Sequence, residues 1–300
     1  MDNVAISISN LSKQYAGSKK YAVLNLSLTV RMGEIYGFIG PNGSGKSTTI
    51  RLLLNFIKPT SGTASIFGND IVKKSLTVKK SIGYLSGEFS AYEKLTCQEF
   101  LTYMTKLQPL KHKNTPAVLS KLFNVEKHKK IQDLSKGNRQ KLGIIQALMH
   151  EPDLLILDEP TDGLDPLMQE KFYSILKKMK SRGSTIFLSS HNLSEVQKIC
   201  DRVAIIREGQ LVAETNITDL IDNSVQTFEV TFKKPILATA LRSISNVINV
   251  SKLNSCTFRF NVKGSLSDVL TFMAKNQAIH IKTNETNLED EFIKFYETKQ

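Results

Sequence analysis

Apolar residues follow two kinds of pattern along most of the chain. At 6–8, and again over 23–30, apolar and polar residues alternate, which predicts half-buried strands joined by a polar connection at 11–15. Residues 34–39, which are mostly apolar after Glu34, predict a short buried strand. Residues 154–157 are entirely apolar, as expected for a central strand buried on both faces of a parallel sheet.

Helical spacing occurs between these strands. Apolar residues recur at helical intervals from 96 to about 148, over 167–180 and over 193–200. Shorter apolar runs predict further strands at 63–67, 82–85, 185–190, 202–206 and 211–213. Alternation of strands and helices predicts an open α/β sheet, in which chemistry lies at the carboxyl ends of the strands.

The pattern changes after Asp222. The elements expected there follow the order β-α-β-β-α-β, at 228–232, 236–244, 247–250, 257–262, 266–275 and 279–281. This order predicts a small ferredoxin-like α+β domain over residues 223–300. Asn287 is a suitable N-cap for one more helix, and no motif that carries chemistry occurs in this part of the chain.

Residues 40–48 match G-x-x-x-x-G-K-[ST], the phosphate-binding loop. They follow the expected strand at 34–39, and the segment 49–54 after them is expected to open a helix. Glycines let backbone N–H groups approach a triphosphate without collision, and the helix adds its positive dipole end. We therefore expect a triphosphate site formed by Gly40, Pro41, Asn42, Gly43, Ser44, Gly45, Lys46, Ser47 and Thr48. A glycine-rich turn that matches by coincidence is the alternative.

Composition sets limits on the class of protein. Hydrophobic residues make up 41% and charged residues 23%, as in an ordinary soluble protein with a sizeable core. The N-terminus lacks the features of a secretory signal, and no stretch approaches the roughly 18 apolar residues of a membrane-spanning helix. Cys97, Cys200 and Cys256 lie outside any metal-ligand spacing and suit a reducing compartment as small buried residues.

The formal net charge is +12, and lysines cluster over 106–130 and at 177–180. Such clusters serve nucleic acid or an anionic membrane face in some proteins. In most proteins they are simply the solvated faces of helices.

Four further motifs follow the phosphate loop. Residues 134–140 read LSKGNRQ, an apolar strand ends in Asp158 and Glu159, residues 162–165 read DGLD, and His191 follows the strand expected at 185–190. Together with the phosphate loop, they resemble the nucleotide-binding subunit of an ATP-binding cassette (ABC) transporter over residues 1–222. The resemblance implies a P-loop NTPase fold with a RecA-like core, an antiparallel β subdomain and a helical subdomain at about 88–150.

The resemblance implies a role for each motif around ATP and Mg²⁺, the expected cofactors. Lys46 is expected to reach the β- and γ-phosphates, and the Ser47 hydroxyl to contact Mg²⁺. Asp158 would hold the metal through its water shell. Glu159 would accept the proton of the attacking water, a contribution worth about 10²–10⁴-fold. His191 would contact the γ-phosphate and hold Glu159 in register.

Other implied contacts come from elsewhere in the chain. Tyr15 is expected to stack on adenine, with Tyr21 as the alternative. In the family, the signature segment binds the γ-phosphate held by the other subunit. Ser135, Gly137 and Asp165 are therefore expected to serve a second ATPase subunit, in a homodimer or with a close homologue, with two ATP molecules between the subunits.

Two departures from the family pattern affect the site. Lys136 replaces the first signature glycine and Asn138 the glutamine, so a charged side chain is expected close to the phosphate. After residues 82–85, the family's metal-binding glutamine is missing, and Glu88 is the nearby residue that could take its place. These departures and the small C-terminal domain resemble bacterial exporters of drugs, antimicrobial peptides and related amphiphiles.

The leading interpretation is an ATPase subunit, peripheral on the cytoplasmic face of the membrane, that energises export through a separate integral membrane permease. The alternative is a soluble cassette ATPase that acts on ribosomes or nucleic acid. The single phosphate loop and the lack of sustained heptads between Gly87 and Leu134 argue against it, so no nucleic-acid partner is expected. An RNA-binding C-terminal domain would need an aromatic-rich strand that is not present.

Overall fold

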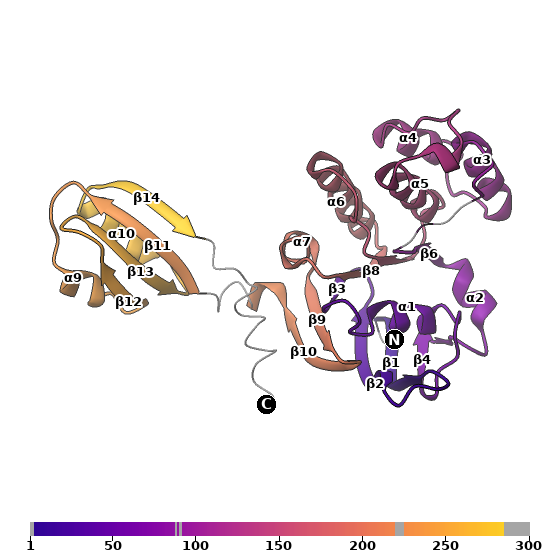
Figure 1. Cartoon of the computed structure of the whole chain (residues 1–300), viewed down its shortest axis with the longest axis horizontal. Coiled ribbons are helices and arrows are strands. Elements are labelled where there is room, and N and C mark those ends of the chain that lie inside the picture. The colour runs from indigo at the N-terminus through magenta and orange to yellow at the C-terminus, as the bar shows by residue number, and fades with distance from the viewer. Residues whose placement is uncertain (1–2, 88, 90–91, 220–224, 285–300) are drawn as a thin grey trace. The chain divides into compact units, whose positions relative to one another are not determined.

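The computed structural model describes residues 3–87, 89, 92–219 and 225–284. The chain divides into two compact units, Met1–Glu214 and Thr215–Gln300 (Figure 1). The boundary expected at Asp222 lies outside the described residues.

A six-stranded sheet forms the centre of the first unit, with strand order β10-β9-β3-β8-β7-β6. Strands β6, β7, β8, β3 and β9 pair in parallel, and every residue of β3, β7 and β8 is buried. The strands are β3 (Ile35–Ile39), β6 (Ile82–Leu85), β7 (Leu154–Asp158), β8 (Thr185–Ser190), β9 (Arg202–Arg207) and β10 (Gln210–Asn216). Parallel pairing brings their carboxyl ends to one edge, where the sequence predicts the chemistry.

A second, antiparallel sheet has the order β2-β1-β4-β5. Its strands are β1 (Val4–Gln14), β2 (Tyr21–Arg31), β4 (Ser61–Ile66) and β5 (Asn69–Asp70). The polar connection predicted at 11–15 is wrong, because β1 continues to Gln14. The register of β1 shifts between Ile8 and Leu11, and Asn10 in this interval has φ 46°. A bulge at Asn10 therefore lets the strand continue although apolar and polar residues no longer alternate.

Seven helices of the first unit lie in the described residues: α1 (Lys46–Leu53), α2 (Ser75–Lys80), α3 (Cys97–Leu107), α4 (Thr115–Leu122), α5 (Lys136–Leu148), α6 (Pro166–Ser181) and α7 (Leu193–Ile199). Helices α3, α4 and α5 lie together, with a 3₁₀ turn at Ile131–Asp133 before α5 (Figure 1). Thr96 and Glu99 form a capping box that starts α3. Helix α1 starts at Lys46, inside the phosphate loop rather than after it.

The core of the first unit joins the two sheets and α1. Phe187 of β8 is fully buried, and its ring centroid lies 5.9 Å from that of Tyr36 and 5.4 Å from that of Phe38, both on β3. These rings pack β3 against β8, the strands that precede the phosphate loop and His191, so the core holds the two motifs at the same edge of the sheet.

The second unit contains a four-stranded antiparallel sheet of order β12-β13-β11-β14. Its described elements are β11 (Val225–Phe232), α9 (Ala238–Arg242), β12 (Val247–Lys252), β13 (Thr257–Lys263), α10 (Ser267–Lys275) and β14 (Ala278–Asn284). Phe228 and Phe260 stack at 5.9 Å in a core separate from that of the first unit. The helix expected from Asn287 lies outside the described residues.

We predict that Phe187→Ala lowers the free energy of unfolding by about 3–5 kcal/mol, because it removes a fully buried ring between two aromatic neighbours. Urea unfolding followed by circular dichroism measures the change. As a control, Phe56→Ala removes a ring that is 54% exposed and should cost less. A loss below about 1 kcal/mol for Phe187→Ala would contradict this account of the core.

Candidate functional site

The phosphate loop connects β3 to α1 and has two positions that only glycine fits. Gly45 has φ 108°, and a Cβ there would lie 2.5 Å from the Ala22 carbonyl oxygen. A Cβ on Gly40 would lie 2.4 Å from the Ile206 carbonyl oxygen. The loop borders a cavity of about 200 Å³, lined by Ala22, Asn42, Gly43, Ser44, Gly45, Lys46, Ser47, Thr48 and Glu159. Backbone N–H groups at a helix start therefore face a space suited to an anion.

Lys46 is buried, and its ammonium group is held by three oxygen atoms. Nζ donates hydrogen bonds to the carbonyls of Gly40 at 2.6 Å and Pro41 at 3.3 Å. It also lies 3.2 Å from Oε1 of Glu159. The predicted phosphate ligand and the predicted base are thus brought together in one cavity.

Asp158 ends β7 and is 6% exposed. The Ser189 hydroxyl of β8 donates a hydrogen bond of 2.6 Å to Oδ1 of Asp158, and it accepts one of 3.1 Å from the Glu159 backbone N–H. Burial raises the pKa of Tyr84 to about 12, and the Asp158 carboxylate adds to this shift. Asp158 is therefore oriented by Ser189 of the neighbouring strand, and it lies close enough to Tyr84 of β6 to disfavour ionisation of that phenol.

Glu159 has a left-handed backbone, with φ 47°. Its Oε2 lies 2.8 Å from Nδ1 of His191 and accepts a hydrogen bond of 3.3 Å from the His191 backbone N–H. Oε1 faces Lys46, so the two oxygens of one carboxylate have different partners. A strained backbone that aims a carboxylate into a cavity is frequent at functional sites.

Among the described residues, Tyr15, Tyr21 and the signature segment do not line this cavity. Tyr15 and Tyr21 are exposed near facing ends of β1 and β2, with the Lys13 ammonium 5.4 Å from the Tyr15 ring centroid. Both rings remain candidates for adenine contact. Glu88 lies outside the described residues.

The signature segment packs against the DGLD loop of the same chain. Ser135 and Asp165 are the N-caps of α5 and α6, and each side chain accepts a backbone N–H. A Cβ on Gly137 would lie 2.4 Å from the Gly163 carbonyl oxygen. Lys136, expected near a phosphate, pairs with Asp162 at 2.5 Å. Among the described residues that line the phosphate-loop cavity, none belongs to these segments.

Three polar residues of the site were missed at the sequence level. Ser189 links Asp158 to the Glu159 backbone. Gln140 of α5 is 4% exposed and donates a 2.9 Å hydrogen bond to the Pro160 carbonyl. Glu195 is buried and accepts a hydrogen bond from Ser190, the residue before His191. For Ser189, the available signal was a polar residue directly after an apolar run. For Glu195, four residues after His191, the sequence offered no signal.

Comparison with known proteins identifies the family. The ABC transporter family model matches residues 23–162. The bacitracin transport ATP-binding protein BcrA of Bacillus licheniformis is 42% identical over 70% of this chain and 69% of its own length. The chain belongs to the ABC transporter family. The linearmycin resistance ATP-binding protein LnrL of Bacillus subtilis (strain 168) is 32% identical over 95% of this chain and 96% of its own.

A solved structure supports the same assignment. It is a dimeric ATP-binding cassette in a post-hydrolysis state, bound to ADP and Pi, with TM-score 0.64 and 25% identity over 71% of this chain and 98% of its own. As an ABC transporter ATPase, the chain binds and hydrolyses ATP. None of its described helices has the length and apolarity needed to cross a membrane.

Proposed function

We propose that the cavity beside the phosphate loop is where this ATPase binds the triphosphate and cleaves it. Loop N–H groups and Lys46 bind the β- and γ-phosphates, which compete with Glu159 for the ammonium group. Released from Lys46, Glu159 accepts the proton of the attacking water while His191 holds Oε2. The 3.2 Å contact between Lys46 and Glu159 carries this proposal, since it places the phosphate ligand beside the base.

The residues present also fit Mg²⁺ that arrives with ATP. Magnesium sites of this kind use one or two protein oxygens together with substrate phosphates. The Ser47 hydroxyl, at the start of α1, and the Asp158 carboxylate, fixed by Ser189, supply such donors. The described residues contain no cluster of three His, Cys, Asp or Glu side chains that could hold a metal alone, which suits an ion held partly by the nucleotide.

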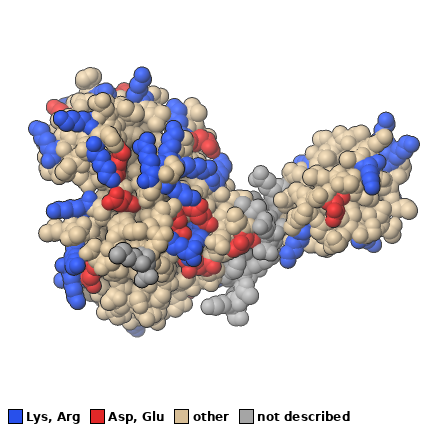
Figure 2. Space-filling model, turned by 180° about the vertical axis from the view of Figure 1, so that it is seen from behind, with Lys and Arg blue, Asp and Glu red and all other residues tan. Residues whose placement is uncertain are grey.

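We further propose that the chain energises export of a drug, a peptide or another amphiphile through a separate membrane permease on whose cytoplasmic side it docks. The names of the bacitracin transport and linearmycin resistance relatives support this class of substrate. The alternative, a soluble ATPase that acts on ribosomes or nucleic acid, has less support. Lys and Arg are spread over the face drawn in Figure 2 with Asp and Glu among them, as on solvated helix faces.

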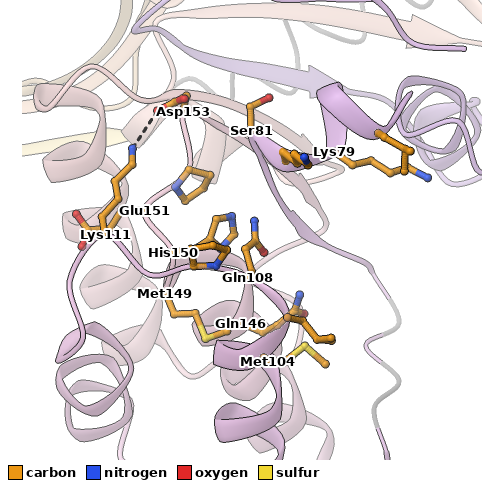
Figure 3. Close-up of a pocket in the computed structure, with 15 residues that line it drawn as sticks. Lys79, Ser81, Met104, Gln108, Lys111, Gln146, Met149, His150, Glu151 and Asp153 are labelled. Carbon is orange, nitrogen blue, oxygen red and sulfur yellow. Dashed lines mark hydrogen bonds and ion pairs between the residues drawn. The ribbon is translucent and has the colours of Figure 1, made fainter. Parts of the chain in front are cut away.

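A groove of about 690 Å³ in the first unit suits a short amphipathic segment of such a permease. It lies between α2, the end of α3 and the end of α5, with Met104, Gln146 and Met149 along it and the Lys111–Asp153 ion pair at one side (Figure 3). Leu76 and Leu107 line it and are 81% and 61% exposed. Exposed leucines beside adaptable methionines favour an apolar partner with a polar rim.

Two subunits are needed to complete each ATP site in this proposal. Ser135 and Gly137 do not line the cavity that contains Lys46, and the dimeric cassette noted above supports an assembly in which they face a second subunit. The C-terminal unit is proposed as a ferredoxin-like domain, on the basis of its element order and its sheet order β12-β13-β11-β14. Regulation or dimer contact is its proposed role.

Glu159→Gln should abolish turnover and leave ATP binding intact, because it removes the proton acceptor and keeps the phosphate ligands. We expect a loss of about 10²–10⁴-fold in ATPase rate. Lys46→Ala, the matched variant, should instead weaken ATP affinity, measured by titration. ATPase activity of Glu159→Gln within a few-fold of wild type would contradict the role of the base.

The dimer is tested with hydrolysis blocked. In sedimentation, Glu159→Gln should dimerise with ATP and stay monomeric with ADP, which lacks the γ-phosphate. Adding Ser135→Arg should prevent the dimer while each monomer still binds ATP, because bulk and charge enter the interface. A monomer that hydrolyses ATP at a specific rate independent of protein concentration would contradict the shared site.

The groove is tested by Leu107→Glu, which places a charge where an apolar contact is proposed. The variant should lose its association with native membranes, measured by flotation, and keep its ATP affinity. Leu237→Glu, at a leucine of the second unit that is 75% exposed, is the control and should behave as wild type. Membrane association of Leu107→Glu equal to wild type would exclude the groove as the docking surface.

A further inference from the structure

Glu195 is a buried carboxyl group with no part in the roles given above. It lies in the first turn of α7 and is 3% exposed. Desolvation by this burial raises the pKa of Glu195, the Glu159 charge adds to the shift, and hydrogen bonds from Ser190 and Thr161 oppose it. An ionised carboxylate is costly in such a place unless both of its oxygens are satisfied.

The two oxygens of Glu195 are unequally supported. The Ser190 hydroxyl donates a hydrogen bond of 2.7 Å to Oε2. Oε1 is buried, and none of the described residues offers it a hydrogen bond of good geometry. The Thr161 side chain favours the charged form of Glu195, but it makes no hydrogen bond that satisfies Oε1. A proton on Oε1 removes the unsatisfied charge.

This cluster holds the chain on both sides of His191. Ser190, just before His191, bonds to Glu195, and the Asn192 backbone N–H, just after it, donates to the same Ser190 hydroxyl at 3.0 Å. Asn192 Oδ1 in turn caps α7 by accepting from the Glu195 backbone N–H at 3.3 Å. His191 is therefore fixed at its flanks, while its own side chain reaches Glu159.

We propose that Glu195, as a neutral acid, is a positioning residue for ATP hydrolysis that ties the His191 segment to α7. The Glu195 carboxyl group binds Ser190 and its backbone N–H binds Asn192, so the residues on both sides of His191 are fixed beside the 2.8 Å contact between His191 and Glu159. The titratable groups that face Glu195 are Glu159, His191, Tyr173 of α6 and Cys200. The positioning role rests on the functions proposed for Glu159 and His191.

Steady-state kinetics of the full chain test the positioning role. Glu195→Ala should lower kcat about ten- to a hundredfold, as misplacement near a reacting centre does, with the KM for ATP within about twofold. Glu195→Gln, which keeps shape and hydrogen bonding without a charge, should restore kcat to within about threefold of wild type. A wild-type kcat for Glu195→Ala would overturn the positioning role. If the kcat of Glu195→Gln is as low as that of Glu195→Ala, the proposal that Glu195 is neutral is overturned.

If Glu195→Ala does not fold, Ser190→Ala takes its place, since it removes the donor to Oε2 and keeps the carboxyl. It should lower kcat without changing the KM, and wild-type kcat would overturn the role.

Infrared difference spectra of wild type minus Glu195→Gln at neutral pH test the neutral acid without turnover. We expect the carbonyl stretch of a protonated carboxylic acid, and a carboxylate band in its place overturns the proposal. This measurement needs no hydrolysis, so its result does not depend on the roles proposed for Glu159 and His191. The ATPase rate of Glu159→Gln tests the role of the base separately.

Discussion

Parallel pairing of β3, β7 and β8 is the constraint on which the site depends. The register pairs Ile39 with Ser190 and Asp158 with Ser189, so the phosphate loop, the two carboxylates and His191 leave the sheet at one edge. All residues of these strands are buried, which leaves little freedom for a slip in register. A shift of one residue would turn Asp158 away from Ser189 and exchange the faces of every side chain along the strand.

Charged groups of both signs lie close together at this edge. Lys46, in a buried position, is compensated by two carbonyls and by Glu159. Asp158 is held by the Ser189 hydroxyl, which brings no charge of its own. The arrangement thus has one ammonium and two carboxylates before nucleotide binds. In the proposed site, a bound triphosphate would offer Lys46 new oxygen acceptors, and the Asp158 carboxylate would supply an oxygen to Mg²⁺.

The sequence predicted those parts of the site that a local pattern defines. The loop glycines, Lys46 and the Asp158–Glu159 pair all follow from short motifs beside an apolar strand. Contacts between distant segments could not be predicted this way. Ser189 and Gln140 act through single hydrogen bonds to residues 31 and 20 positions away, which depend on sheet register and helix packing. The connection predicted at 11–15 was wrong because a bulge at Asn10 lets β1 keep pairing after the alternation of apolar and polar residues stops.

Helix α5 and the loop that follows Glu159, the proposed base, are joined by contacts within one chain. Gln140 of α5 bonds to the Pro160 carbonyl, directly after Glu159, and Gly137 at the start of α5 packs against Gly163. The Lys136–Asp162 pair adds a third contact, although an exposed ion pair contributes little by itself. Since the buried amide of Gln140 would lose its partner if α5 moved alone, a displacement of α5 must carry the Glu159 loop with it. If α5 docks against a second subunit, its movement would therefore shift the backbone beside Glu159, the proposed base. In the same proposal, Glu195 would resist rotation of His191 away from Glu159.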